Sequence, residues 1–452
     1  MRESAMVDAR PVAGCEIDLS VYRSSLCDLD TFRKTGRVTK VVGLVIEGAG
    51  PRLPVGGIVL IHPGEGDGPI EAEVVGFSEN SVYLMPLGDA RGIVPRDEIR
   101  AVRDRSTVGV GRSMLGRVLD GIGRPLDGLG EVDCDSQWPI YGVSSNPAAR
   151  RRIDSAMDVG IRAINGLLTI GLGQKVGIFS GSGVGKSVLM GMIARHCSAD
   201  VNVIALIGER GKEVREFLER DLGQAGLRRS VVVCATSDRS PLERMRGAFF
   251  ATGIAEYFRS HGMNVLLMMD SLTRFAMARR EIGLSIGEPP TARGYTPSVF
   301  TSMGQMLERA GTREGPGSIT GIYTVLVEAD DLNDPVGDAA RSFLDGHIVL
   351  SRRLAEQNHY PAVDVLASAS RAMSDITDKE HRDYVGRFRS LLATYRDSED
   401  LLKIGAYQSG SDKELDKAIS RYPLLVKYLR QDVNESAGLA ESMIGLAESL
   451  EG

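Results

Sequence analysis

The sequence predicts an α/β protein with three parts: a P-loop parallel-sheet core, an N-terminal small β-barrel and a C-terminal helical domain. Three observations predict this arrangement. Between residues 101 and 375, apolar runs of strand length alternate with helical stretches, as in β-α-β units around a parallel sheet. Residues 36–100 instead contain short β-branched runs separated by Gly and Pro, which is typical of small barrels. From residue 376 onward the strand pattern ends and helical segments follow.

The composition of the whole chain is that of a globular protein in water. Its 452 residues are enough for two or three domains, and 42% of them are hydrophobic. No apolar run approaches the roughly 20 residues that span a bilayer. The first residues lack the apolar centre of a signal peptide. We therefore expect the protein to remain in the cytoplasm.

The charge and the cysteines argue against some classes of function. The formal net charge of −6 provides no basic footprint for general nucleic-acid binding. The five cysteines are an odd number without C-x-x-C spacing, so they indicate neither a disulfide framework nor a zinc site. We expect them to be reduced and structural.

The N-terminal segment, residues 1–35, is predicted to contain one short amphipathic helix. Residues 16–33 place apolar side chains at helical spacing, namely Leu19, Tyr22, Leu26 and Leu29. Two interpretations stay open for this helix: it docks on its own domain, or it binds a partner.

The predicted barrel, residues 36–100, carries no recognisable chemistry. Its strands are short and closely spaced, with runs such as VVGLVIEG, GGIVLIHPG and EAEVVGF. The region offers only Phe77 and Tyr83 as aromatic residues near each other. An RNA-binding surface of stacked aromatic side chains requires more than this.

The core and the last domain differ in their periodicity. In the core, residues 101–375, the apolar runs KVGIFSG, VNVIALIG, SVVVCAT and NVLLMMD predict parallel strands with helices between them. In the last domain, residues 376–452, segments such as EHRDYVGRFRSLLATY and LDKAISRYPLLVKYL predict helices.

The stretch FSGSGVGKSVLM, residues 179–190, predicts a phosphate-binding loop between a strand and a helix. The usual pattern is G-x-x-x-x-G-K-[ST], and Ser180 stands where the first Gly is expected. Ser180 need only tolerate the turn that leaves the strand, so we expect it to be harmless. A Cβ at Gly183 or Gly185 would obstruct the approach of phosphate to the backbone N–H groups. The predicted binding residues are Gly181, Ser182, Gly183, Val184, Gly185, Lys186, Ser187 and Val188.

Two side chains of the loop and one distant carboxylate predict a magnesium–phosphate site. Lys186 can supply positive charge to the β- and γ-phosphates, and the Ser187 hydroxyl can coordinate Mg²⁺. NVLLMMD places Asp270 at the end of a neighbouring strand, where it can reach the metal through water. The alternative for Asp270 is a cap on the following helix.

A carboxylate at the end of a third strand predicts hydrolysis rather than binding alone. In ALIGERGKEVREF, Glu209 follows the strand and is placed to polarise the water that attacks the γ-phosphate. The next residue, Arg210, either holds the γ-phosphate or forms a structural ion pair. Because Lys186 and Glu209 occur together, a nucleotide-binding scaffold without hydrolysis is disfavoured.

Further motifs resemble the ATPases of flagellar and type III protein export, relatives of the catalytic subunits of rotary ATP synthases. In the core these motifs are IGERG, DSLTRFAMARRE, GEPPTARGYTPSVF, LERAG, GSITGIYTVLVEADDLNDP and LDGHIVLSR. Upstream, LGRVLDGIGRPLDGLG and GIRAINGLLTIGLGQ extend the similarity, and IGAYQSGSDKELDKAI extends it into the helical domain. The similarity covers residues 36–430.

This resemblance implies a homohexameric ring that binds ATP between subunits and hydrolyses it with Mg²⁺. Hydrolysis would energise protein export through a flagellar type III secretion apparatus, since ERGKEVREF is more similar to the flagellar branch than to the injectisome branch. In HYPAVDVLASASRAM, Tyr360 matches the aromatic residue that packs on adenine. Arg371 matches the arginine finger that reaches the neighbouring subunit's site and stabilises charge on the γ-phosphate.

The resemblance also implies a set of partners and a location. The partners are other copies of the chain, a stator-like regulatory protein at the N-terminal helix, a central stalk-like protein, export-gate membrane proteins and chaperone–substrate complexes. No nucleic acid is expected. The protein would be cytoplasmic and peripherally associated with the inner membrane at the export apparatus.

Three other functional interpretations stay open. An injectisome ATPase of type III secretion is one of them, since only a few residues in ERGKEVREF favour the flagellar branch. A catalytic subunit of a rotary ATP synthase would act beside a different ring chain. An RNA translocase would share DSLTR and the Glu-Arg pair after the third strand, but its RNA-binding fold would carry exposed aromatic residues.

Overall fold

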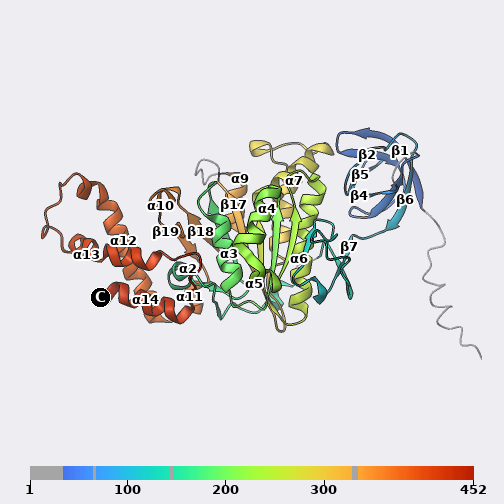
Figure 1. Cartoon of the computed structure of the whole chain (residues 1–452). Coiled ribbons are helices and arrows are strands. Elements are labelled where there is room, and N and C mark those ends of the chain that lie inside the picture. Colours follow the sequence, from blue (N-terminus) through green and yellow to red (C-terminus); the bar gives the residue numbers. More distant parts are fainter. Residues whose placement is uncertain (1–33, 65–67, 143–145, 328–333, 452) are drawn as a thin grey trace, which may run out of the picture.

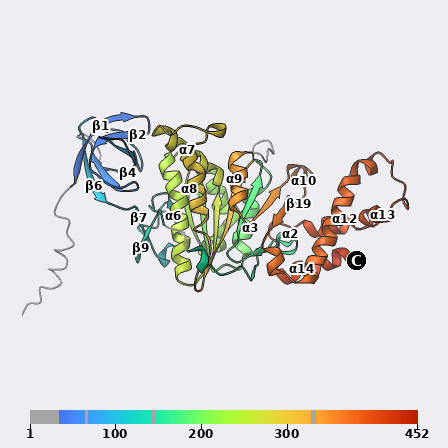
Figure 2. The same ribbon diagram turned by 180° about the vertical axis from the view of Figure 1, so that it is seen from behind.

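The computed structural model describes residues 34–64, 68–142, 146–327 and 334–451, which form three units in a row (Figure 1). A β-barrel lies at one end, a large sheet with its helices in the middle and a group of helices at the other end. The view from behind shows the same order (Figure 2). The predicted fold class is therefore confirmed. The predicted helix at residues 16–33 lies outside the described residues, and the domain boundaries stay predictions.

Six short strands close the barrel in the order β1-β2-β5-β4-β3-β6. They are β1 (Thr35–Val42), β2 (Val45–Ala49), β3 (Ile58–His62), β4 (Ile70–Phe77), β5 (Val82–Pro86) and β6 (Glu98–Arg103). Alternate apolar side chains fill the interior, and Val59, Ile61 and Val74 are fully buried there. Closure leaves the barrel without a free strand edge.

The central sheet has nine strands: eight follow the order β19-β18-β12-β17-β15-β13-β14-β8, and the short β16 pairs with β17 beside this path. They are β8 (Val118–Asp120), β12 (Lys175–Ser180), β13 (Val201–Ile207), β14 (Ser230–Ala235), β15 (Asn264–Asp270), β16 (Gly311–Thr312), β17 (Ser318–Leu326), β18 (Gly346–Leu350) and β19 (Val363–Ser370). From β18 to β8 all neighbours along this path are parallel. Their carboxyl ends therefore meet at one edge, where ligands bind in such sheets.

The strands are buried on both faces, which explains their continuous apolar runs. Along β13, Val203 and Ala205 pack in one core, while Ile204 and Leu206 pack in another. The first core includes α6 (Pro241–Ser260), α7 (Leu272–Ser285) and α8 (Pro297–Leu307). The second includes α3 (Lys186–His196) and reaches into the helical domain.

The helical domain is built from three helices that follow the sheet. They are α12 (Lys379–Lys403), α13 (Lys413–Leu429) and α14 (Leu439–Glu451). In the α12–α13 hairpin the rings of Tyr395 and Tyr422 stack, with centroids 3.5 Å apart and planes 9° from parallel. Within the described part of the chain, no helix is both long and apolar enough to cross a membrane.

Shorter elements connect these units. The strands are β7 (Thr107–Val110), β9 (Ser136–Pro139), β10 (Ala156–Met157) and β11 (Ile170–Gly171). The helices are α2 (Arg162–Leu167), α4 (Gly211–Glu216), α5 (Gly223–Arg228), α9 (Pro335–Phe343), α10 (Arg352–Glu356) and α11 (Met373–Ile376). A π-helical turn, η3 (Phe217–Leu222), joins α4 to α5. The single-turn 3-10 helices are η1 (Arg112–Met114), η2 (Pro147–Ala149) and η4 (Ala292–Gly294).

A buried polar cluster attaches the barrel to the central sheet unit. Glu73 of β4 accepts a 2.7 Å bond from Arg246 of α6 and a 2.6 Å bond from the hydroxyl of Tyr141. Burial raises the pKa of Glu73, and the positive charge of Arg246 opposes this rise. Arg246 also donates to Ser106, next to β7. One guanidinium group therefore ties the barrel, the connecting chain and α6 together.

We predict that Arg246→Met will lower the free energy of unfolding by about 3–5 kcal/mol, because Glu73 would keep a buried charge without its partner. Chemical denaturation followed by circular dichroism measures this. The matched control is Arg91→Met, since the ion pair of Arg91 with Asp89 is exposed and should contribute little. Equal, small effects of the two substitutions would contradict a structural role for the Arg246 cluster.

Candidate active site

The predicted phosphate loop lies between β12 and α3, at the carboxyl edge of the sheet. β12 ends at Ser180 and α3 begins at Lys186. Gly183 and Gly185 have φ angles of 78° and 91°, in the left-handed region that favours glycine. Apart from Gly183 and its two chain neighbours, no described residue has an atom within 4 Å of the position that a Cβ on Gly183 would take, so this side of the loop is open. The turn can therefore present its backbone N–H groups to an anion at the helix N-terminus.

Ser180 is buried, and its hydroxyl has no hydrogen-bond partner among the described residues. Its backbone carbonyl accepts a 3.0 Å bond from the N–H of Val327, which fixes the end of β12. The side chain therefore takes no visible part in the loop, in keeping with the expectation that this position only has to fit the turn.

Lys186 points toward two carboxylates rather than into solvent. Its Nζ forms an ion pair and hydrogen bond with Asp270 Oδ1, and it lies 3.7 Å from Glu209 Oε1. Asp270 ends β15 and Glu209 follows β13, so the sheet order brings the three residues together. The hydroxyl of Thr324 on β17 donates a 2.7 Å bond to the same oxygen of Asp270. The predicted loop lysine, strand-end aspartate and glutamate thus form one cluster.

The carboxyl group of Glu209 is tuned by its surroundings. Burial, followed by the negative charge of Asp270, raises its pKa to about 7, while the ammonium group of Lys186 opposes this rise. A carboxyl group with a pKa near neutrality can exchange a proton with water at physiological pH. Glu209 therefore has the protonation behaviour that a general base needs.

The donor set of the cluster fits a magnesium–phosphate complex. Ser187 lies in the first turn of α3 and offers a hydroxyl, and Asp270 offers a carboxylate. Mg²⁺ prefers oxygen ligands and binds phosphate sites through one or two protein groups and several waters. The described residues contain no group of three or more His, Cys, Asp or Glu side chains that could hold a metal by itself. Any magnesium here would therefore depend on the phosphates.

Two predicted arginines lie away from this cluster. The side chain of Arg210 is 81% exposed and lies 3.6 Å from Glu213 in the next turn. Arg371 follows β19 and is also exposed. Its backbone N–H donates to the carbonyl of Asp345, but its side chain has no hydrogen bond or ion pair to any described residue. Neither guanidinium group approaches Lys186 of its own chain through a described contact.

The predicted aromatic residue, Tyr360, lies against the phosphate loop. A Cβ added to Gly185 would lie 3.4 Å from its ring, so the ring and the loop are in contact. The side chain is 41% exposed. The flat face of a half-exposed tyrosine beside the loop is suited to a nucleobase, which stacks on aromatic rings.

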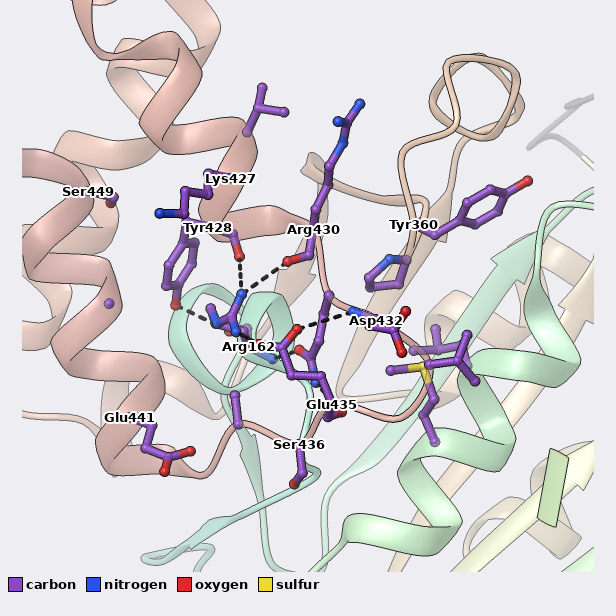
Figure 3. A pocket seen from close by; sticks show the side chains of 18 of the residues that line it. Arg162, Tyr360, Lys427, Tyr428, Arg430, Asp432, Glu435, Ser436, Glu441 and Ser449 are labelled. Atoms are coloured by element: carbon purple, nitrogen blue, oxygen red, sulfur yellow. Dashed lines mark hydrogen bonds and ion pairs between the residues drawn. The ribbon is translucent and has the colours of Figure 1, made fainter. Parts of the chain in front are cut away.

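A cavity of about 1350 Å³ extends from the loop and Tyr360 toward the helical domain (Figure 3). Its walls include Val188 and Met192 of α3, Arg162 of α2, and residues of α13, α14 and the chain between them. Figure 3 shows Arg162 bonded to this connecting chain, with Tyr360 on the opposite side. The cavity is large enough to hold the base and ribose of a nucleotide whose phosphates lie on the loop.

Sequence reasoning missed Thr324 and the helical domain's share of the cavity. Thr324 gives a weak signal, a polar residue within the apolar strand GIYTVLVE. The chain between α13 and α14 gives none, because its residues reach the cavity only through tertiary packing.

Comparison with known families matches all three units. Residues 38–103 match the beta-barrel domain of the ATP synthase alpha/beta family, and residues 160–370 match its nucleotide-binding domain. Residues 377–448 match the T3SS EscN ATPase C-terminal domain.

The chain is also similar to characterised relatives along most of its length. It is 51% identical to the flagellum-specific ATP synthase of Bacillus subtilis, over 92% of this chain and 95% of the relative. It is 50% identical to the type 3 secretion system ATPase of Xanthomonas euvesicatoria, over 91% and 92% of the two chains.

Solved structures give the same result. The assembled ATPase EscN from the enteropathogenic E. coli type III secretion system has a TM-score of 0.87 at 45% identity, covering 92% of this chain and all of EscN. EscN in complex with its central stalk EscO has a TM-score of 0.85 at 44% identity, with the same coverage.

We predict opposite outcomes for two small substitutions in the loop. Gly185→Ala should weaken nucleotide binding at least tenfold, because alanine is strained at φ 91° and its Cβ would obstruct the approach of phosphate to the loop. Ser180→Ala should leave binding unchanged, since it only removes an unpaired buried hydroxyl. Isothermal titration with ATP measures both. Loss of binding in Ser180→Ala would show that this hydroxyl has a role in the loop.

Proposed function

The chain belongs to the family of flagellum-specific ATP synthases and type 3 secretion system ATPases, and we propose that it hydrolyses ATP at the interfaces of a homohexameric ring. The hydrolysis would energise protein export through a flagellar type III secretion apparatus. One observation carries the proposal: a single chain holds the phosphate loop, Lys186 between the carboxylates of Glu209 and Asp270, and an unpaired exposed Arg371. A ring of identical chains needs all of these in one sequence.

The residues of the loop would bind and orient the triphosphate. The residues are Gly181, Ser182, Gly183, Val184, Gly185, Lys186, Ser187 and Val188. Lys186 would transfer its ion pairs from the two carboxylates to the β- and γ-phosphates, which leaves Glu209 free. Ser187 and Asp270 would hold Mg²⁺, which neutralises charge on the phosphate oxygens when bound. Tyr360 would stack on the adenine and set the position of the base.

Glu209 would orient the attacking water and accept its proton. Its raised pKa makes it a stronger base than an ordinary carboxylate while it is still ionised above neutral pH. Asp270 is less suited to this step, because it contacts Lys186 and Thr324 and would serve the metal. The two carboxylates thus take different roles because of different surroundings.

Arg371 would complete the site of the neighbouring subunit. Its guanidinium group is exposed and unpaired among the described residues, so no internal partner must be given up. At a closed interface it would stabilise the negative charge that develops on the γ-phosphate. Arg210 is exposed as well, and we propose that it approaches the γ-phosphate only when the interface closes.

We propose the partners by analogy with the family. EscN has been solved with a central stalk, and we propose that this ring also surrounds a stalk-like protein. In protein export the ring would act on chaperone–substrate complexes and on export-gate membrane proteins. A stator-like regulatory protein would bind the N-terminal segment. The protein would act in the cytoplasm, peripherally associated with the inner membrane, without nucleic acid.

A catalytic subunit of a rotary ATP synthase is the second candidate, since the nucleotide-binding domain match is to the ATP synthase alpha/beta family. Such a subunit would depend on an arginine from a different chain. ATP hydrolysis by the purified chain alone, without a different ring chain, separates the two candidates.

We predict that Mg²⁺-dependent phosphate release by the purified chain will rise more steeply than linearly with protein concentration. Arg371→Ala should lower the specific activity about 10³-fold or more, because an arginine finger acts on the transition state, while ATP binding is retained. Arg91→Ala, on the exposed surface of the barrel, is the control. Absent or flat activity in protein that binds ATP would instead favour the rotary subunit.

We predict that kcat/KM will rise with pH through about 7, because Glu209 must lose its proton before it can accept one from water. Glu209→Gln should bind ATP normally and lose about 10²–10⁴-fold in kcat, with the residual activity lacking this pH limb. Steady-state rates between pH 5.5 and 9 measure both. If Glu209→Gln abolished ATP binding, its role would be structural.

A further inference from the structure

The chain between α13 and α14, residues 430–438, lies at the base end of the cavity and is held there by one buried amide. Gln431 has only 5% of its surface exposed. Burial of a glutamine is costly unless its polar atoms are bonded, so its partners show what it holds.

The side chain of Gln431 bonds to the chain at the start of α2 and to its own segment. Its Oε1 accepts a 2.7 Å bond from the N–H of Arg162, and its Nε2 donates a 2.7 Å bond to the carbonyl of Gly160. A further 2.9 Å bond runs from Nε2 to the carbonyl of Glu435. An N–H faces the oxygen and two carbonyls face the nitrogen, so the amide can bond in only one orientation.

The backbone of the same residue bonds to the proposed base-stacking residue. The N–H of Gln431 donates a 3.0 Å bond to the carbonyl of Tyr360. Gln431 thus joins three segments that are distant in sequence: the start of α2, Tyr360, and the chain that enters α14.

The connecting chain is also fixed on its other side. Arg195, near the end of α3, donates a 2.8 Å bond to the carbonyl of Val433. α3 is the helix whose N-terminus carries the phosphate loop. Arg162 donates to the carbonyl of Arg430 at 3.0 Å and forms an ion pair with Glu435 (Figure 3). Residues 430–435 therefore connect the helical domain to the loop helix and to Tyr360.

We propose that Gln431 is a positioning residue: it sets the place of Tyr360 beside Gly185, so that the helical domain controls how well a nucleobase stacks while the phosphate loop is unaffected. This inference rests on the proposed function, in which Tyr360 stacks on adenine. The contribution of the nucleobase to the binding affinity can then be measured separately from the contribution of the phosphates.

The test compares a ligand with a base and one without. Gln431→Met keeps the length of the side chain but removes its three polar bonds. We expect it to raise KM for ATP about five- to tenfold with little change in kcat, and to leave the inhibition constant of inorganic tripolyphosphate unchanged. The matched control is Asn434→Met, since Asn434 is exposed, lies in the same segment and does not line the cavity.

Two further variants make the outcome decisive. Tyr360→Ala should raise KM for ATP by itself, and adding Gln431→Met to it should have little further effect, because both act on the same stacking contact. If Tyr360→Ala leaves KM unchanged, the stacking role in the proposed function fails. If Tyr360→Ala raises KM and Gln431→Met does not, only the present inference fails. An equal rise for ATP and tripolyphosphate in Gln431→Met would also overturn it.

A measurement on the unaltered protein covers the case in which the variants fold poorly. Hydrogen exchange of the peptide spanning residues 429–437 should slow when ATP is added, because its adenine contacts Tyr360. It should not slow with tripolyphosphate, which has no base. Equal protection by both ligands, or protection by neither, would contradict the role of Gln431.

Discussion

Two carboxylates and one ammonium group share a poorly solvated space at the carboxyl edge of the sheet, and the structure is arranged around this charge balance. Burial raises the pKa of Glu209, because it penalises an unpaired charge, and the ammonium group of Lys186 opposes this rise. The triphosphate would form ion pairs with the same lysine. Binding of the substrate therefore changes the charge state of the site that hydrolyses it.

The sheet order makes this balance possible. β12 delivers the loop, β13 and β15 deliver the carboxylates, and β17 separates β12 from β15. Thr324 lies on the separating strand and bonds Asp270, so the gap between the loop and the carboxylate is filled by a polar contact. The β-barrel is attached to the sheet unit by another polar contact, between Glu73 and Arg246. In both contacts, Thr324 with Asp270 and Arg246 with Glu73, a buried carboxylate is bonded by a residue from a distant part of the chain.

The sequence was sufficient for the three-part fold and for most of the candidate site. Glycines before a Lys-Ser pair and acidic residues at strand ends are local patterns, and local patterns report on loops and sheet edges. The proposed roles of Tyr360 and Arg371 rest on family resemblance, since neither has a local signature. Gln431 could not be found either way, because its importance lies in bonds to residues about 70 and 270 positions away. The pairing of Glu73 with Arg246 was hidden for the same reason.

The stacked tyrosines of the α12–α13 hairpin link its two helices. A helix of 25 residues such as α12 is about 37 Å long, and the contact between Tyr395 and Tyr422 clamps it to α13. The stack therefore joins the two arms of the hairpin at one point, next to Pro423 within α13. Its free tip lies far from the sheet, while the inner end of α13 leads directly into Arg430 and Gln431. The helical domain therefore reaches Tyr360 through one continuous stretch of chain, from the end of α13 to the Gln431 N–H that bonds the Tyr360 carbonyl.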